Sequence, residues 1–414
     1  MVRARWMAGV AAVLASAALV AGCGASASAE NHVAGRVLTV YASVPYVGAS
    51  APDARAVVGG LQLALDESHH RVGRYRIALH ILDDATAQSG GWDPGQTSAN
   101  ARRAAANPST IGYIGEIDSG ASAVSIPLLN RAGIPQISPT STAVGLTSAG
   151  AGALPGEPEK YYPKQGRTFV RLAPDDAVQA AVQVRAQLGA GCRRTVALED
   201  DDVDGRDAAL TFAAVARGSG LPVTGPEPFA KGADDRAAAT FVARSGAACV
   251  LIAGLDDRRA ADLARSIAAA APGTMLFGWA GLGAPGFIDP AAGGVPAWLA
   301  PQAVLTGLVA GAAPPSPARR FQSAYARRYG APPPAAAYGY EAMSLLLDAI
   351  GRASGGGRGE VGRSAVLAAL FHTRGRRSGL GTYSVAADGD TTLDRYGIYR
   401  VRNGRLALWK VMSP

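Results

Sequence analysis

The chain has 414 residues, 48% of them apolar, so it is too long for one ordinary hydrophobic core and fits two domains of usual size. Its formal net charge of +8 is compatible with nucleic-acid binding, but the basic residues are scattered among acidic ones. Their densest stretch, Arg374 to Arg377, is short. We therefore expect a solvated basic surface and no nucleic-acid partner.

The start of the chain has the pattern of an export signal. Two arginines precede an uncharged run over residues 6–21, which is short for a membrane span and typical of a signal-peptide core. Two small residues stand directly before Cys23, as in the bacterial lipobox. We predict a signal peptide over 1–22, lipidation of Cys23 and a flexible tether over 23–35. The alternative is a plain signal peptide with an incidental cysteine.

From residue 37 onward, strand patterns alternate with amphipathic helix patterns. The first predicted elements are strand 37–41, helix 55–67, strand 75–82, helix 96–107, strand 111–114, helix 121–131 interrupted at Pro127, and strand 134–137. Such alternation implies parallel strands joined by right-handed crossovers.

A segment rich in Gly, Pro and Ala, over 148–165, is predicted to be a surface loop, after which the alternation starts again. The second series is strand 168–171, helix 176–188, strand 195–199, helix 206–217, strand 249–253, helix 256–270 and strand 274–278. Two similar units imply two similar lobes. Strand 304–308 and helices 318–329, 338–352 and 361–371 follow, and then three strands expected to be antiparallel, 382–385, 397–401 and 406–411.

Two cysteines remain beyond the export signal. Cys192 and Cys249 each lie at or just before a predicted strand of the same half of the chain. In an exported protein such a pair favours a disulfide, and two buried free thiols are the alternative.

Five groups of short segments follow one another along the chain in a characteristic order. They are 45–48 with 59–67, the pair 83–84, Ile114-Gly115 leading to Ser119 and Pro127, the stretch 133–142, and 169–171 with 175–176. In order and spacing they resemble the leucine/isoleucine/valine-binding family, the substrate-binding components of branched-chain amino acid transporters. The resemblance covers the chain from about Val37 to Trp409.

This resemblance implies an α/β fold of the periplasmic binding protein type I kind. Two doubly wound parallel-sheet lobes would be joined by three hinge crossings, with the ligand in the cleft between them. Lobe one would comprise 36–172 plus 308–377, and lobe two 173–307 plus 378–414. Ligand sites at the carboxyl ends of parallel strands agree with the general rule for open α/β sheets.

The resemblance also implies ligand-binding residues. Ser119, next to Asp118, matches a family serine at a helix start that faces the ligand carboxylate, and helix N-termini favour anions. Thr140 and Thr142 match the second family loop, and Asp176 matches an acidic residue at the first crossing. Capping of helices and turns is the alternative role for these side chains.

Other positions depart from the family pattern. Asp53 replaces a closing tyrosine, and Asp204 before Gly205 replaces a tyrosine of lobe two. Leu255 replaces an aromatic residue, and Ala280 replaces the acidic residue that pairs with the ligand ammonium group. The carboxylate-binding half is thus kept, whereas the half contributed by lobe two is changed.

Six acidic residues stand between Glu199 and Asp207. The opening of a calcium loop is matched by Asp200, Asp202, Asp204 and Gly205, but Thr211 at the twelfth position cannot supply the carboxylate that such loops use. A solvated turn is one interpretation. The other is a patch, including Asp204, that faces the cleft and attracts a cationic ligand group.

No nucleophile motif or metal-ligand spacing is present in the sequence, so we expect neither an enzyme nor a cofactor or metal. The expected protein is a monomeric, lipid-anchored, extracytoplasmic receptor for an amino acid or a related carboxylate, and its partner is an ABC permease. A sensor that signals to a partner protein and an exported enzyme on the same fold are the alternatives.

Overall fold

The computed structural model describes residues 33, 35–164, 166–200, 202–229, 234–254, 257–309 and 316–414. The predicted signal peptide and Cys23 lie outside these residues. Within them, no helix combines the length and the apolarity that a membrane crossing requires.

Lobe one is built on a six-stranded sheet, mostly parallel, in the order β2-β3-β1-β6-β7-β8. Eight residue pairs join β1 to β3, from Val37 with Arg76 to Val44 with Asp83. The strands are β1 (Val37–Val44), β2 (Arg71–Val72), β3 (Tyr75–Asp83), β6 (Thr110–Ile114), β7 (Gln136–Ser138) and β8 (Phe169–Arg171).

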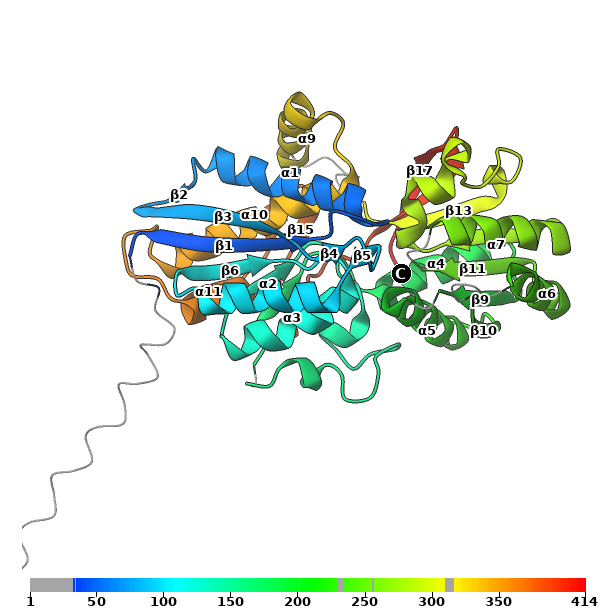
Figure 1. Cartoon of the computed structure of the whole chain (residues 1–414), viewed down its shortest axis with the longest axis horizontal. Helices are drawn as coiled ribbons and strands as arrows, with labels where there is room; N and C mark the ends of the chain where they lie inside the picture. Colours follow the sequence, from blue (N-terminus) through cyan, green and yellow to red (C-terminus); the bar gives the residue numbers. More distant parts are fainter. Residues whose placement is uncertain are drawn as a thin grey trace, which may run out of the picture.

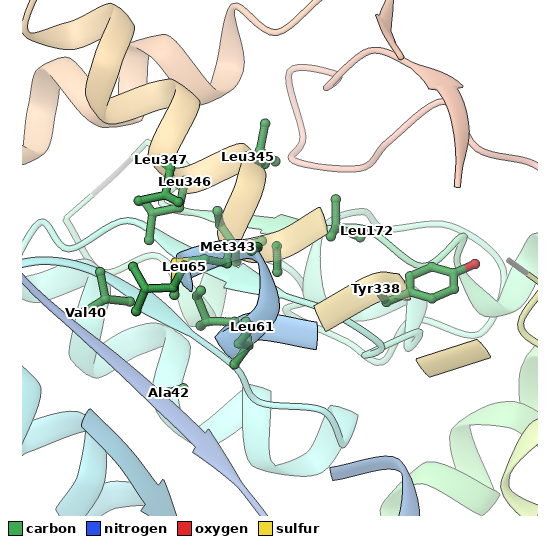
Figure 2. Close-up of a cluster of buried hydrophobic side chains, with 14 of the residues drawn as sticks. Val40, Ala42, Leu61, Leu65, Leu172, Tyr338, Met343, Leu345, Leu346 and Leu347 are labelled. Carbon is green, nitrogen blue, oxygen red and sulfur yellow. The ribbon is translucent and has the colours of Figure 1, made fainter. Parts of the chain in front are cut away.

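Helices cover both faces of this sheet (Figure 1). They are α1 (Ala51–Glu67), α2 (Pro94–Ala106), α3 (Ser119–Arg131), α9 (Ser316–Tyr329), α10 (Pro334–Ala353) and α11 (Arg363–Phe371). On one face, α1 and α10 lie against each other, and Leu61 and Leu65 form one buried cluster with Met343 and with Val40 of β1 (Figure 2). On the other face, α2 and α3 enclose a smaller cluster around Tyr113. The two covered faces make lobe one doubly wound.

Lobe two is built on a seven-stranded sheet in the order β10-β9-β11-β12-β13-β16-β17. Its strands are β9 (Thr195–Glu199), β10 (Val223–Pro228), β11 (Cys249–Ala253), β12 (Met275–Gly278), β13 (Ala303–Gly307), β16 (Tyr396–Arg402) and β17 (Arg405–Met412), of which the last two are antiparallel to their neighbours. Its helices are α4 (Asp176–Gly189), α5 (Val203–Gly218), α6 (Asp235–Ser245), α7 (Asp257–Ala270) and α8 (Pro285–Ile288). Separate apolar clusters on its two faces make this lobe doubly wound as well.

Shorter elements complete the chain. They are the strand pairs β4 (Ala85–Thr86) with β5 (Gly91–Trp92) and β14 (Arg376–Ser378) with β15 (Gly381–Tyr383), and the 3-10 helices Val144–Leu146, Glu159–Tyr161, Ala280–Gly283, Pro290–Ala292 and Ala300–Gln302. In the structure a disulfide joins Cys192 to Cys249, whose Cα atoms are 5.9 Å apart.

The predicted two-lobed α/β fold is confirmed, with differences in detail. The helix α3 continues through Pro127 without interruption. The sequence pattern missed β10, an edge strand that contains Gly225 and Pro226, and α6, whose buried face is mainly alanine. Proline is tolerated at a sheet edge because no neighbour needs its missing N–H group, but it removes the usual strand signal.

The chain passes between the two sheets after β8, after β13 and before β16. The expected division assigned residues 378–414 to lobe two. In the structure β15 pairs with β14, and Tyr383 and Val385 are part of the lobe-one core. The chain up to Val385 therefore packs with lobe one. At the crossings, the fully buried Arg171 donates to Asp390 Oδ1 over 2.6 Å.

Candidate functional site

A cavity of about 370 Å³ lies between the two lobes, where segments following the strands of both sheets face each other. On the side of lobe one, the cavity is lined by segments that follow β1 and β6. On the side of lobe two, much of the lining follows β9, β11 and β12. Its lining includes Ser50, Asp53, Ile117, Asp118, Ser119, Thr140, Thr142, Asp204, Gly205, Gly254, Trp279, Ala280, Leu308, Pro334, Tyr399 and Leu406. The position agrees with the rule that open α/β sheets bind ligands at the carboxyl ends of their strands.

The N-terminus of α3 is capped from the other lobe. Asp118 occupies the capping position of α3, but its side chain makes no capping hydrogen bond. Instead, the backbone N–H groups of Ser119 and Gly120 donate to the two carboxylate oxygens of Asp204, over 2.8 and 3.4 Å. The free N–H groups and dipole of a helix start favour an anion, and here a side chain of lobe two supplies it.

The hydroxyl group of Ser119 links this helix start to the next loop. Its oxygen accepts hydrogen bonds from the backbone N–H groups of Thr142 and Ala143, each over 3.1 Å. The Thr140 hydroxyl donates to the carbonyl of Ile117 over 2.9 Å. These bonds hold the two lobe-one loops together and fix the position of the α3 N-terminus.

Only one of the two carboxyl oxygens of Asp118 has a hydrogen-bond partner in the described part of the chain. Its Oδ1 accepts a hydrogen bond from the Ser50 hydroxyl over 2.8 Å, but its buried Oδ2 has no partner among the described residues. The residue is 8% exposed. Desolvation, followed by repulsion from the charge of Asp84, raises the pKa of Asp118 to about 7. Asp118 thus lines the cavity and carries a buried acceptor that no described residue uses.

Asp204 lies in the first turn of α5 and reaches the first turn of α3. Its backbone N–H donates to the Asp202 carboxylate over 3.0 Å, and that residue caps α5. Burial, followed by repulsion from the charge of Asp118, raises the pKa of Asp204 well above its usual range. The nearness of two buried carboxyl groups makes double ionisation costly.

The rest of the cavity wall is largely apolar. The indole N–H of Trp279 donates to Asp176 over 3.3 Å, and the Tyr399 hydroxyl donates to the carbonyl of Leu308 over 2.7 Å. The indole N–H and the phenol O–H are thus hydrogen-bonded within the protein, and the apolar parts of the two rings are left to contact a ligand. No Lys, Arg or His among the described residues lines the cavity.

The structure brings most of the predicted ligand-binding residues to one cavity. Those that line it are Asp118, Ser119, Thr140, Thr142 and Asp204, together with the departing positions Asp53 and Ala280. Asp176 lies behind the wall, where it is 2% exposed and holds Trp279. Leu255 lies outside the described residues. The described side chains form no cluster suited to a metal ion.

Sequence reasoning missed several residues of the wall. Ser50 lies one residue before α1 and carries no motif of its own, although its neighbourhood belongs to the first loop. Trp279 stands beside Ala280, the position that was singled out, and a large aromatic after a buried strand is a signal that could have identified it. Tyr399 and Leu406 reach the cavity from the antiparallel C-terminal strands, whose position beside β13 depends on tertiary pairing.

Comparison with known proteins gives a family and a fold. A family model described as "Periplasmic binding protein" matches residues 39–405. No curated relative matches the chain.

Among solved structures, a leucine-binding protein of Thermotoga maritima is 23% identical, covers 91% of this chain and 99% of its own, and has a TM-score of 0.76. The branched-chain amino acid transporter substrate-binding protein of Streptococcus pneumoniae, in complex with isoleucine, is 19% identical, with coverage of 91% and 100% and a TM-score of 0.72. A Rhodopseudomonas palustris solute-binding protein in complex with benzoate is 19% identical, with coverage of 91% and 97% and a TM-score of 0.71. At these identities the structures establish a shared fold.

Proposed function

The chain belongs to the periplasmic binding protein family, whose members bind solutes and are not enzymes, and we propose that it is the substrate-binding component of an ABC importer. The proposed ligand is a small polar solute, of the size of an amino acid, held between the lobes. The observation that carries this proposal is the cavity of about 370 Å³ lined by both lobes. The structural relatives in complex with isoleucine and with benzoate support a ligand of this size.

The proposed mechanism is hinge closure. Three chain crossings allow the lobes to separate, admit the solute and close around it. Lobe one supplies the start of α3 and the loop of Thr142, whereas lobe two supplies Asp204 and Trp279. A ligand that touches both lobes stabilises the closed form because it binds the open form less well. The permease would then recognise the closed form.

The proposed location is the outer face of the cell membrane. The uncharged run over residues 6–21 and the small residues before Cys23 support export followed by lipidation. The tether that follows would keep the two-lobed body near the permease. Substitution of Cys23 by Ser should release the protein from membranes without changing solute binding, and fractionation of cells checks this.

A thermal-shift screen of the mature chain tests solute binding. Amino acids, small carboxylates, neutral solutes and amines form the panel, and a true ligand raises the melting temperature by mass action. A cavity-filling variant, Ala280→Trp, should abolish the shift, because Ala280 lines the cavity. Ala326→Trp, at an exposed position of α9, is the matched control and should retain it. The absence of a shift across every class of solute would contradict the proposed function.

A further inference from the structure

The anion position at the start of α3 is already filled by the protein. Asp204 accepts the N–H groups of both Ser119 and Gly120. Ser119 is the residue to which the sequence resemblance assigned a ligand carboxylate. A ligand carboxylate would therefore have to displace Asp204 or lie beside it, and like charges at that distance repel.

The cavity also lacks the other groups that bind carboxylates. Among the described residues, no cationic side chain lines it. Three carboxyl groups line it instead, since Asp53 joins Asp118 and Asp204. These carboxyl groups favour a positively charged ligand, because the electrostatic energy of an ionised carboxylate falls when a cation approaches it.

An acidic cluster alone would not define a ligand, but Asp118 gives a second, independent indication. Its Oδ2 is buried and unpartnered, while Oδ1 is held by the Ser50 hydroxyl. Buried carboxylate oxygens are normally hydrogen-bonded, and an orphaned one on a cavity wall implies a donor that the protein does not itself supply. The residue is 8% exposed, so bulk water does not take this role freely. An ammonium or guanidinium group carries such donors and the compensating charge.

Other residues of the wall fit the body of such a ligand. Trp279, Leu406 and Tyr399 line the cavity from lobe two and have no charge. The ring of Trp279 is oriented by Asp176, which accepts its N–H over 3.3 Å. An aromatic face of this kind binds an alkyl chain, and it also attracts a cation.

Building on the proposed function, we propose that the solute is a small organic cation, an amine or a guanidine, whose charged group is received by Asp118 and Asp204. No ligand carboxylate is required, because Asp204 already occupies the N-terminus of α3. This inference names the ligand class of the same cavity and differs from the amino acid or carboxylate expected from the sequence.

Three molecules of one shape test the charge preference. 3-Methylbutylamine is leucine without its carboxyl group, and 4-methylpentanoate is leucine without its amino group. With leucine, they form a matched set for isothermal titration calorimetry at about pH 8, where carboxyl groups are more ionised. Benzylamine and benzoate form a second pair. We expect each amine to bind at least about tenfold more tightly than its carboxylate partner and than the zwitterion, as the loss of a charge-assisted hydrogen bond implies.

Two variants test the assigned residues. Asp118→Asn should weaken amine binding by about tenfold or more, because it keeps the shape and removes the charge. Asp204→Ala should weaken amine binding, because it removes a carboxyl group. It should also strengthen carboxylate binding, because it frees the backbone N–H groups at the start of α3. Asp394→Asn, at an exposed position away from the cavity, is the control and should change neither. Circular dichroism establishes that each variant is folded.

The outcomes separate the two proposals. If leucine or a carboxylate binds as tightly as the matched amine and Ala280→Trp abolishes that binding, the chain is a solute-binding protein and the inferred cation preference is wrong. Amine binding that is unchanged in both Asp118→Asn and Asp204→Ala also overturns the inference. If no solute of any charge binds, the proposed function itself fails.

Discussion

At the scale of single residues, burial of carboxyl groups between the lobes should give the empty protein an unusual pH dependence. Burial raises the pKa of Asp118 and of Asp176 to about 7, well above the usual value near 4. Between about pH 4 and pH 7 the folded chain therefore holds more protons at these groups than the unfolded chain does, so their contribution to stability falls as pH rises.

We expect the ligand-free protein to lose stability through this window, and Asp118→Asn to flatten the profile. The measurement is the free energy of unfolding in urea at a series of pH values. An Asp118→Asn profile parallel to that of the wild type would contradict the raised pKa of Asp118. Binding of an organic cation should show the reverse trend and strengthen as pH rises, because it requires the ionised carboxylates.

Much of the lobe-one wall was predictable because its residues directly follow buried strands. Ser119, Thr140 and Thr142 come after β6 and β7, and strand ends of one sheet meet at one edge. What the sequence could not reveal is that Asp204 would cap α3, since a contact between residues 85 positions apart depends on how the lobes face each other. Asp176, also predicted at the ligand, is not among the residues that line the cavity and accepts the indole N–H of Trp279.

At the scale of elements, the contact between α1 and α10 depends on glycine. A Cβ atom on Gly339 would overlap the backbone carbonyl oxygen of Val57, and a Cβ atom on Gly60 would overlap that of Ala336. Because these obstacles are backbone atoms, rotation of a side chain cannot relieve them. The close approach of the two helices allows their leucines to form the core seen in Figure 2.

We expect Gly339→Ala to lower the free energy of unfolding by about 1–3 kcal/mol, although alanine favours a helix more than glycine does. Gly351→Ala, in the same helix, is the matched control, because its Cβ would meet only a Val72 methyl group at 3.7 Å. That variant should gain about 0.5–1 kcal/mol from helix propensity. Urea unfolding measures both, and equal effects of the two substitutions would contradict the packing argument.

The disulfide should be a main stabiliser of lobe two. It joins the segment before β9 to the start of the neighbouring strand β11, across 57 residues of chain. Closing a loop of this length lowers the entropy of the unfolded chain by an amount equivalent to about 4 kcal/mol. Replacing Cys192 and Cys249 together by alanine should lower the unfolding midpoint markedly and leave solute binding intact below it. Free thiols located on Cys192 and Cys249 in the denatured chain, by labelling with a thiol reagent and peptide mass spectrometry, would exclude the bond.

The patterns that predicted the elements were those that burial imposes on the chain. Strands buried on both faces, such as β11, are continuous apolar runs and were predicted within a residue or two. The edge strand β10 and the alanine-rich α6 bury too little large apolar surface to produce such a pattern. The place of β15 beside β14 is set by packing in the lobe-one core.

At the scale of the whole molecule, charge is divided between surface and cavity. The chain has a formal net charge of +8, yet the described residues that line the cavity include carboxyl groups and no cationic side chain. Net charge is therefore a poor guide to the ligand of a protein whose site is enclosed. In the structure, the contact of Asp204 with the start of α3 joins the two lobes directly.

This contact should hold part of the empty protein in the closed form. Hydrogen bonds to a charged group contribute about 1.5–3 kcal/mol each, which is enough to shift an equilibrium between open and closed forms. Small-angle X-ray scattering of ligand-free Asp204→Ala should therefore give a larger radius of gyration than that of the wild type. Asp394→Asn, whose side chain is exposed, should match the wild type. If Asp204→Ala and the wild type scatter identically without ligand, the contact does not govern closure, and the lobes are held by the chain crossings alone.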